Sequence, residues 1–298
     1  MTRPRPLPSA VLLLLAIGPV ACGGPAPSAP GGAAEGPPRR GGEATAATIA
    51  DISSVNELIA TGTTFEADLL SQLFLGLLRE RADYQEHPPT YAPELAESWE
   101  FSPDRKTLTL HLRGDALWSD GVPITAEDVR FSWQAQTNPD VAWAYSDTKD
   151  TIRDVEVIDA RTVRFHYDQV YAFQLVDTVD GRILPRHLWS QVPFPEWRSR
   201  GDWFRENLAT SGPFRLAEWR PSQELVLARN ERFYDPELPR LDRVRFRIVP
   251  DQPAQVEQLL AGALDFLPAV PPAEAERLAR RPEIELVVHP ARQYDYIC

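Results

Sequence analysis

Cysteine is almost missing from this chain of 298 residues, in which Cys22 and Cys298 are the two that occur. They lie far apart in the sequence, so a CxxC redox pair and a zinc cluster built from cysteines are both excluded. Residues 23–297 contain none. That pattern fits a protein that enters an oxidising compartment without needing a disulfide to hold its fold.

Lysine is equally scarce, with Lys106 and Lys149 as its two occurrences. Nearly all positive charge is therefore arginine, which we attribute to coding bias. The formal net charge is −12. A nucleic acid partner is excluded, because a phosphate-binding surface needs clustered positive charge. Acidity alone names no ligand, since it also keeps many exported proteins soluble.

Motifs of catalysis are lacking as well: we find no Gly-rich phosphate loop, no GxSxG elbow, no HExxH and no internal repeat. His187 has no second ligand at i+3 or i+4, so a structural or surface role is favoured over a catalytic or metal-binding one. The 43 acidic residues must form pairs by chance, and no spacing singles out a catalytic pair. The sequence therefore predicts no catalytic residues and no metal site.

A long hydrophobic run is also absent near the start of the chain. The apolar stretch 11–17 follows Arg3 and Arg5; it is too short to span a bilayer and is typical of a signal peptide. Residues 1–22 end in small residues before Cys22, which resembles a bacterial lipobox and predicts lipid attachment there. Pro19 departs from that pattern, and ordinary cleavage near Ala21 is the alternative. Residues 23–42, rich in Gly, Pro, Ala and Ser, predict a flexible linker.

Hairpins dominate what is present. Residues 107–112 alternate, with Leu108, Leu110 and Leu112 on one face, which predicts a half-buried strand paired with residues 98–101 across the turn at 102–104. Residues 155–158 and 163–167 predict a second hairpin. Thr125, with an acid three residues later, is the capping box of a helix start.

Further elements follow from the same patterns. The best helix runs over residues 61–81, where Thr63 and Glu66 form a capping box ahead of an apolar stripe. A weaker strand is expected around 46–52. Other predicted strands cover residues 214–219, 224–229, 243–249, 264–267 and 284–288, and other helices cover 253–261, closed by Gly262, and 271–279.

The ordered set of motifs resembles the family-5 extracellular solute-binding proteins, the peptide and nickel receptors of ABC importers. The resemblance rests on the first hairpin, the WSDG turn at 118–121 and the TAEDV helix start at 125–129. It spans about residues 41–297 and continues through ILPRH (183–187), SGPF (211–214), EW (218–219), ARN (228–230), FY (233–234), LD (241–242) and FRIVPD (246–251).

This resemblance implies an α/β fold of the periplasmic-binding-protein-like type II class, in its large peptide-receptor cluster. Residues 43–298 would form the N-terminal part of the domain, with a hairpin-rich subdomain over about 93–167. The sheet and helices of lobe I would take about 43–92 and 168–298. Family members are normally longer, so we expect the chain to hold the first lobe and lack the second. One edge of the central sheet should then be unpaired, and the chain should self-associate and bind solute weakly.

The resemblance also implies function. We expect an extracytoplasmic substrate-binding component that binds peptides or similar small solutes and delivers them to ABC permease subunits by lobe closure. It would be periplasmic or at the cell surface, held to the membrane by a lipid anchor, and would need no cofactor. The alternatives are a truncated relic that binds nothing and, from a different class, a secreted hydrolase.

Ligand contacts are expected where the family's matching loop faces the cleft. These are Thr61, Gly62, Thr63 and Thr64 before the long helix, and Tyr294 and Tyr296 on the strand that crosses to the second lobe. Backbone amides at a helix start and hydroxyls can bond peptide groups, and aromatic residues line clefts. Thr63 could instead be a cap alone. Trp143 and Tyr145 could stack on a ligand or pack.

Overall fold

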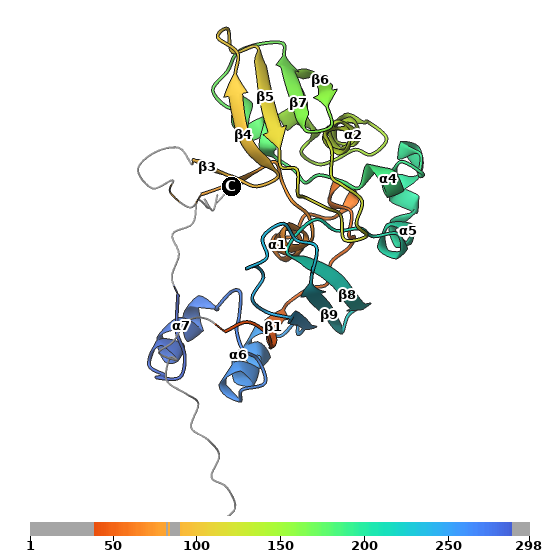
Figure 1. Ribbon diagram of the computed structural model, residues 1–298. Coiled ribbons are helices and arrows are strands. Elements are labelled where there is room, and N and C mark those ends of the chain that lie inside the picture. Colours follow the sequence, from red (N-terminus) through yellow and green to blue (C-terminus); the bar gives the residue numbers. More distant parts are fainter. Residues whose placement is uncertain (1–38, 82, 84–89, 288–298) are drawn as a thin grey trace, which may run out of the picture.

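Two four-stranded sheets, with helix α1 (Thr64–Leu73) between them, form the body of the protein (Figure 1). The computed structural model describes residues 39–81, 83 and 90–287. Within these residues, no helix has both the length and the apolar character needed to cross a membrane.

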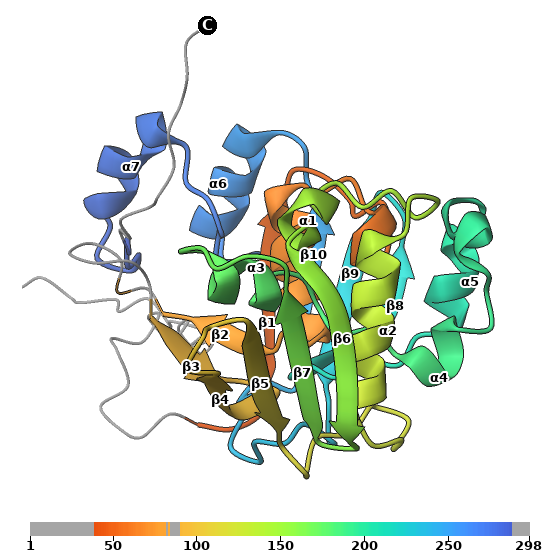
Figure 2. The ribbon, with the colours of Figure 1, turned by 90° about the horizontal axis from the view of Figure 1, so that it is seen from above.

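The first sheet is built from two local hairpins. Its strands are β4 (Ala96–Phe101), β5 (Thr107–Leu112), β7 (Thr162–Tyr167) and β6 (Ile152–Asp159), in that order and all antiparallel. Both predicted hairpins are thus confirmed, and the three alternating leucines of β5 are buried. Helix α2 (Ala126–Thr137) lies along β6 and β7 (Figure 2).

The predicted cap of α2 is also confirmed. The Asp128 carboxylate accepts the Thr125 N–H at 2.8 Å and the Thr125 hydroxyl at 3.0 Å. Asp128 is almost fully buried, and burial raises its pKa although these hydrogen bonds oppose the shift. The capping pattern therefore fixes where the helix packed on the first sheet begins.

The second sheet joins residues that are distant in sequence. Its order is β1 (Glu43–Thr48), β10 (Arg243–Ile248), β9 (Glu224–Arg229) and β8 (Phe214–Arg220), with β1 and β10 parallel and the other pairs antiparallel. The three later strands occur as predicted. The first strand was predicted too late in the sequence, because it ends at Thr48 and is followed by a loop.

The outer edge of β1 is partly occupied. Ala46 forms a single bridge with Phe266, and the Asp265 N–H donates to the Thr45 carbonyl at 2.7 Å. The strand predicted over 264–267 is reduced to this bridge. No strand forms over the described residues 284–287, against the prediction for 284–288, since no neighbouring strand pairs with them there.

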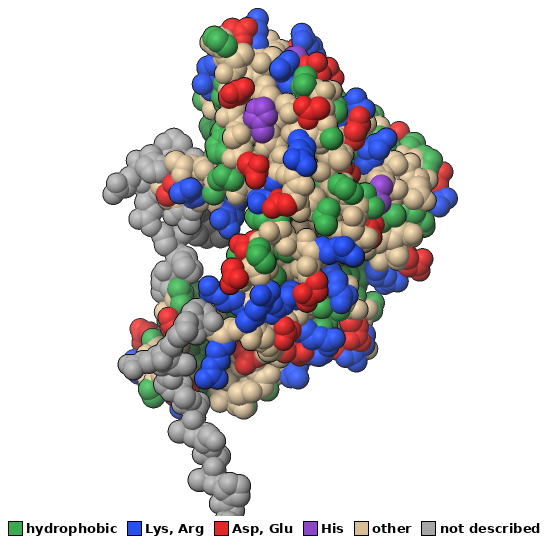
Figure 3. Space-filling model, viewed as in Figure 1, with side chains coloured by type: hydrophobic (Ala, Val, Ile, Leu, Met, Phe, Trp, Pro, Cys, Tyr) green, Lys and Arg blue, Asp and Glu red, His purple; other side chains and the backbone are tan. Residues whose placement is uncertain are grey.

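Charged side chains cover one face of the second sheet. An ion-pair network crosses the strands from Arg220 to Glu224, then to Arg245 and on to Glu43. Figure 3 shows arginine and acidic side chains intermixed over the surface that these strands occupy. The opposite face carries Phe246, which meets Phe65 of α1 with ring centroids 5.3 Å apart. One face of this sheet is therefore charged and solvent-facing, and the other packs against α1.

Helix α1 is shorter than predicted. Its apolar stripe continues to Leu78, but the helix ends at Leu73 and the chain turns into β2 (Leu78–Glu80), which pairs with β3 (Tyr91–Pro93). The Ser211 and Gly212 N–H groups both donate to the Leu73 carbonyl, at 2.9 and 2.8 Å. The stripe stays apolar because the extended residues after α1 are buried on all sides.

Buried apolar side chains from both sheets belong to one contiguous core. The hairpin sheet thus shares its core with the second sheet. Predicted helices α6 (Gln252–Leu260) and α7 (Pro272–Ala279) are present. The remaining elements are η1 (Glu57–Ile59), η2 (Ser146–Lys149), α3 (Gln174–Val179), α4 (Arg186–Trp189), η3 (Phe194–Ser199) and α5 (Gly201–Glu206).

Candidate ligand-binding face

The predicted ligand turn, residues 61–64, lies exposed at the N-terminus of α1. Thr63 is the N-cap, and its hydroxyl accepts the Glu66 N–H at 3.3 Å. A helix start presents backbone N–H groups that have no partner within the helix. The turn can therefore donate hydrogen bonds to a polar solute.

The Glu66 carboxylate holds this turn in place. It does not complete the predicted capping box, because it reaches the preceding loop instead of the Thr63 N–H. One oxygen accepts the Ser53 N–H (2.6 Å), the Ser53 hydroxyl (2.8 Å) and the Ser54 N–H (3.1 Å). The other accepts the Thr61 hydroxyl (3.0 Å) and the Gly62 N–H (2.9 Å).

Glu66 is fully buried, which by itself would raise its pKa. The hydrogen bonds from Ser53, Ser54 and Thr61 outweigh that effect and hold the pKa below its usual value. The carboxylate is thus kept ionised inside the protein. An ionised acceptor of this kind fixes the backbone of the turn more firmly than a neutral one.

Tyr145 stands beside the turn. Its hydroxyl lies 3.9 Å from the point that a Cβ on Gly62 would occupy, and 54% of the residue is exposed. Trp143 lies under it, buried, with the two ring centroids 5.7 Å apart and nearly perpendicular. The two aromatic residues whose role was left open therefore divide the tasks: Trp143 packs and Tyr145 faces outwards.

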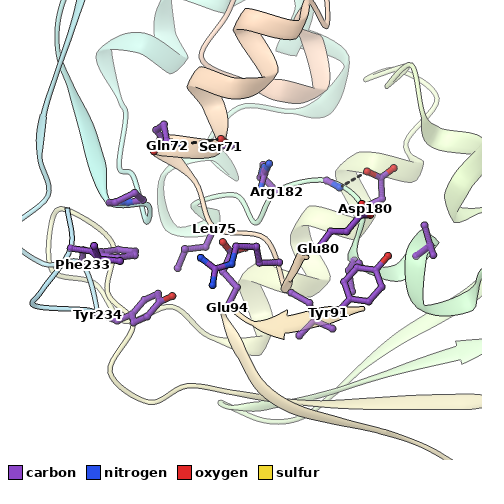
Figure 4. Close-up of a pocket in the computed structure, with 17 residues that line it drawn as sticks. Ser71, Gln72, Leu75, Glu80, Tyr91, Glu94, Asp180, Arg182, Phe233 and Tyr234 are labelled. Carbon is purple, nitrogen blue, oxygen red and sulfur yellow. Dashed lines mark hydrogen bonds between the residues drawn. The ribbon is translucent and has the colours of Figure 1, made fainter. Parts of the chain in front are cut away.

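A hollow of about 530 Å³ opens further along α1 (Figure 4). It lies between the C-terminal half of α1, the β2–β3 pair and the loop that follows α3. Figure 4 shows Phe233 and Tyr234 on one side, Tyr91 on the other, and Arg182 between them. Its charged lining residues are Arg79, Glu80, Glu94, Asp180 and Arg182.

Electrostatics in the hollow are governed by burial and by Arg182. Burial raises the pKa of Glu94, and the Arg182 charge and a hydrogen bond from the Gly76 N–H (2.8 Å) oppose it. Burial likewise raises the pKa of Glu57, whose carboxylate accepts the Arg182 N–H at 2.8 Å. Both signs of charge thus meet aromatic surface at one site, which suits a zwitterionic solute held without covalent chemistry.

The turn and the hollow are connected through Gly181. A Cβ on Gly181 would approach the Trp143 ring to 3.3 Å and the Gln136 amide nitrogen to 2.3 Å, so this position needs glycine. Its backbone φ of +82° points to the same residue type. A chain of contacts thus links turn 61–64 to Tyr145, Tyr145 to the buried Trp143, and Trp143 to loop 180–182. We call these residues together the ligand face.

Of the predicted ligand residues, the four in turn 61–64 come together on this face. Tyr294, Tyr296 and Cys22 lie outside the described residues. Sequence reasoning missed the anchoring role of Glu66 and the placement of Glu94 and Arg182. The signal for Glu66 was visible as a capping acid; nothing local marked the other two. The Nε2 of His187 lies 2.7 Å from the Asp120 carboxylate.

Across the described residues, no group of three or more His, Cys, Asp or Glu side chains could hold a metal ion. The ligand face therefore offers hydrogen bonds, charge and aromatic surface.

Comparison with known proteins identifies the family and the fold. The profile of the bacterial extracellular solute-binding proteins, family 5, matches residues 90–298. The dipeptide-binding protein DppE of Bacillus subtilis is 26% identical over 67% of this chain and 38% of its own length. The periplasmic oligopeptide-binding protein OppA of Escherichia coli is 27% identical over 78% of this chain and 44% of its own.

Solved structures show the same fold. AppA from Bacillus subtilis, in complex with a nonapeptide, matches with a TM-score of 0.72 and 24% identity over 81% of this chain and 46% of that one. NikZ from Campylobacter jejuni, in complex with Ni(L-His), matches with a TM-score of 0.69 and 23% identity, over 80% of this chain and 45% of that one. This chain thus spans less than half the length of these relatives. Binding proteins, not enzymes, make up this group, and the chain belongs to the bacterial extracellular solute-binding proteins of family 5.

Proposed function

We propose that the protein is the extracytoplasmic substrate-binding component of an ABC importer that binds peptides or related small solutes. The observation that carries this proposal is turn 61–64, an exposed helix start whose backbone is fixed from inside by the ionised Glu66. A peptide is rich in carbonyl acceptors. Because Thr61 and Gly62 already donate to Ser53 and Glu66, the donors that the turn can offer them are the N–H and hydroxyl groups of Thr63 and Thr64. The names of the relatives DppE and OppA support this class of solute.

The hollow extends the same proposal. Arg182 can attract a carboxylate, while Glu94 and Asp180 can attract an amine, so both ends of a short peptide find a partner. Tyr91, Phe233 and Tyr234 add aromatic surface for side chains. We assign to the ligand Thr61, Gly62, Thr63 and Thr64, with Tyr294 and Tyr296 as further proposed contacts.

Delivery would follow lobe closure. A solute favours the closed form only by contacts that it makes to both lobes, and the ligand face supplies one side of them. The closed form would then dock on ABC permease subunits. The hairpin sheet would keep its proposed place as a subdomain of lobe I over about 93–167.

The proposed location is outside the cytoplasm. Residues 1–22 would act as signal, Cys22 as lipid attachment site, and residues 23–42 as the linker that lets the receptor stand off the membrane. Mass spectrometry of the mature N-terminus tests this. A diacylglycerol-modified Cys22 is the expected result, and an intact Met1 would contradict export.

Titration calorimetry with trialanine and a mixed tripeptide library tests the binding itself, on a protein that carries both lobes. We expect saturable binding, weakened about tenfold by Tyr145→Ala through loss of aromatic contact on the ligand face. Phe173→Ala is the matched control, because this aromatic residue is similarly exposed (63%) and does not line the hollow. No saturable binding by the unaltered protein would favour the relic, and hydrolysis of the library would favour the hydrolase.

A further inference from the structure

Lys149 carries a charge into the interior of the protein, where an apolar side chain could fill the same space. It is 1% exposed and ranks among the largest fully buried side chains of the described residues. Its ammonium group donates to the Asp180 carbonyl at 2.8 Å and to the Asp177 carbonyl. A buried ammonium without partners is strongly unfavourable, so these two bonds define its position.

The two carbonyls belong to the end of α3. The last carbonyls of a helix lack partners within the helix and carry the negative end of its dipole. The Lys149 ammonium group supplies hydrogen-bond donors to these carbonyls and a positive charge at the negative end of the helix dipole. It does so from a different part of the chain. Immediately after these carbonyls, Asp180, Gly181 and Arg182 line the hollow. The lysine therefore holds the end of α3 from which this part of the hollow's wall continues.

The chain on the other side of Lys149 carries Tyr145. The lysine is the last residue of η2, which starts directly after Tyr145, and the Thr148 hydroxyl donates back to the Tyr145 carbonyl at 2.7 Å. The Lys149 ammonium also lies 5.7 Å from the centre of the Trp143 ring. One side chain thus fastens the Tyr145 segment to the wall segment.

A second fastening comes from Glu57. Its carboxylate accepts the Arg182 N–H at 2.8 Å, and η1, to which it belongs, leads into turn 61–64. The charges of Glu57 and Lys149 attract one another, as do those of Lys149 with Asp177 and Asp180. The wall segment is therefore held at its start by Lys149 and at Arg182 by Glu57.

We propose that Lys149 is a positioning residue that couples the Tyr145 segment (141–150) to the wall segment (177–182) of the ligand face. This inference rests on the proposed function for its binding readout, but its structural readout is independent. A lysine that only stabilised the fold would change global stability. A positioning lysine changes the local order of these two segments together, and with it the geometry offered to a solute.

Amide hydrogen exchange on the 298-residue chain is the first test. Lys149→Met removes the charge and keeps an unbranched side chain of similar length. We expect faster exchange in 141–150 and 177–182, with rates in α2 and β5 unchanged. Lys106→Met, at the only other lysine, is the matched control, because Lys106 is exposed in the β4–β5 turn. Unchanged exchange in both segments, or an equal rise throughout the chain, would overturn the proposal.

Amine labelling of the unaltered chain is the second test and needs no variant to fold. Acetic anhydride at neutral pH, followed by peptide mapping, should modify Lys106 at least tenfold faster than Lys149, since the latter is fastened inside. Equal rates would show that the fastening does not exist.

The binding readout uses trialanine and a protein with both lobes. Lys149→Met should weaken binding about tenfold, within the range of coupled sites, while Lys106→Met leaves it unchanged. If exchange rises in both segments but affinity does not change, the coupling to the ligand face is wrong. If the unaltered protein binds no peptide, the proposed function fails while the exchange and labelling results still decide the fastening.

Discussion

The two ends of α1 are built by different means. At the N-terminus, the turn is exposed and is held by side-chain hydrogen bonds, above all those of Glu66. At the C-terminus, Leu73 is buried, and the helix is closed by backbone N–H groups from Ser211 and Gly212. The end that can meet a solute is thus fixed by polar groups, and the end inside the protein by close backbone packing.

This difference decides what can be predicted. The position of the N-terminal end is encoded by adjacent residues, a threonine cap with an acid three residues later, and the sequence therefore predicted it. The C-terminal end depends on residues 211–212, more than a hundred positions away, whose contact with α1 leaves no local trace. An apolar stripe that continues past Leu73 is then read as more helix, although it belongs to a buried extended segment.

Gly212→Ala should give the largest effect, because it breaks the closed end. A Cβ there would lie 2.4 Å from the Gln72 carbonyl oxygen and 2.8 Å from the Leu73 carbonyl carbon, both backbone atoms that cannot turn aside. We expect the free energy of unfolding to fall by about 3 kcal/mol or more. Urea denaturation followed by tryptophan fluorescence measures it.

Gly201→Ala is the matched control for that substitution. No heavy atom lies within 4 Å of a Cβ on Gly201, which opens α5. Its stability should stay within about 0.5 kcal/mol of the unaltered protein. A similar loss in both variants would show that α1 is not closed by backbone contact at Gly212.

Glu66→Ala tests the N-terminal end of α1, which polar groups hold, and should give the next largest loss of stability. It leaves the buried Ser54 N–H and the donors of the more exposed Ser53 and Gly62 without their acceptor, at a loss of about 3 kcal/mol. Because the folded-state pKa is lowered, the contribution of Glu66 is present above its unfolded pKa and is lost as pH falls through the folded pKa. The difference in unfolding free energy between the two proteins should therefore shrink below about pH 4.5.

Glu276→Ala serves as the comparison for Glu66. Glu276 is exposed and pairs with Arg280 on the surface of α7. Such pairs contribute little, so we expect a change below about 1 kcal/mol. The anchoring role would be contradicted if Glu66→Ala lost no more unfolding free energy than Glu276→Ala. It would also be contradicted if the loss caused by Glu66→Ala did not shrink at acid pH.

The same contrast explains what sequence could say of the fold and site. The strands of the two hairpins were predictable one by one, since the partners within each hairpin are neighbours in sequence and the turns carry Pro103, Asp104 and Asp159. The second sheet was predicted as strands, but the parallel pairing of β1 with β10 came from no local pattern. In the proposed site, turn 61–64 was predicted from the family resemblance and its cap, whereas Arg182 and Glu94 meet only after folding.

Lys149 extends the comparison to α3, whose C-terminus is closed by a buried charge. Burial lowers the pKa of Lys149 from 10.5 to about 8, against the attraction of Asp180, Asp177 and Glu57. Between these pH values the unfolded chain binds the proton and the folded chain does not, so stability should rise with pH. The rise, relative to Lys149→Met, should be roughly 3 kcal/mol.

Urea denaturation of both proteins at pH 7, 8, 9 and 10 checks this. Tyr171, whose pKa burial raises to about 12, is present in both and cancels in the difference. Parallel stability curves for the two proteins would show that the ammonium group is not buried as described.

Thr63→Ala should have the smallest effect on stability and sharpens the comparison most. Its hydroxyl accepts a single N–H, that of Glu66, at 3.3 Å, so its loss should lower the unfolding free energy by about 1 kcal/mol. Thr63→Ser keeps the cap and should restore stability. Thr64→Ala, one residue on in the same exposed turn, should change stability by less than about 0.5 kcal/mol.

Peptide affinity then separates a cap from a contact. If Thr63 is a cap alone, Thr63→Ser binds trialanine like the unaltered protein, since the turn keeps its shape. If Thr63 also touches the solute, the missing methyl group weakens binding although stability is restored. If Thr63→Ala were as stable as the unaltered protein, the Thr63 cap would contribute nothing to stability. Turn 61–64 would then be held by the Glu66 carboxylate alone.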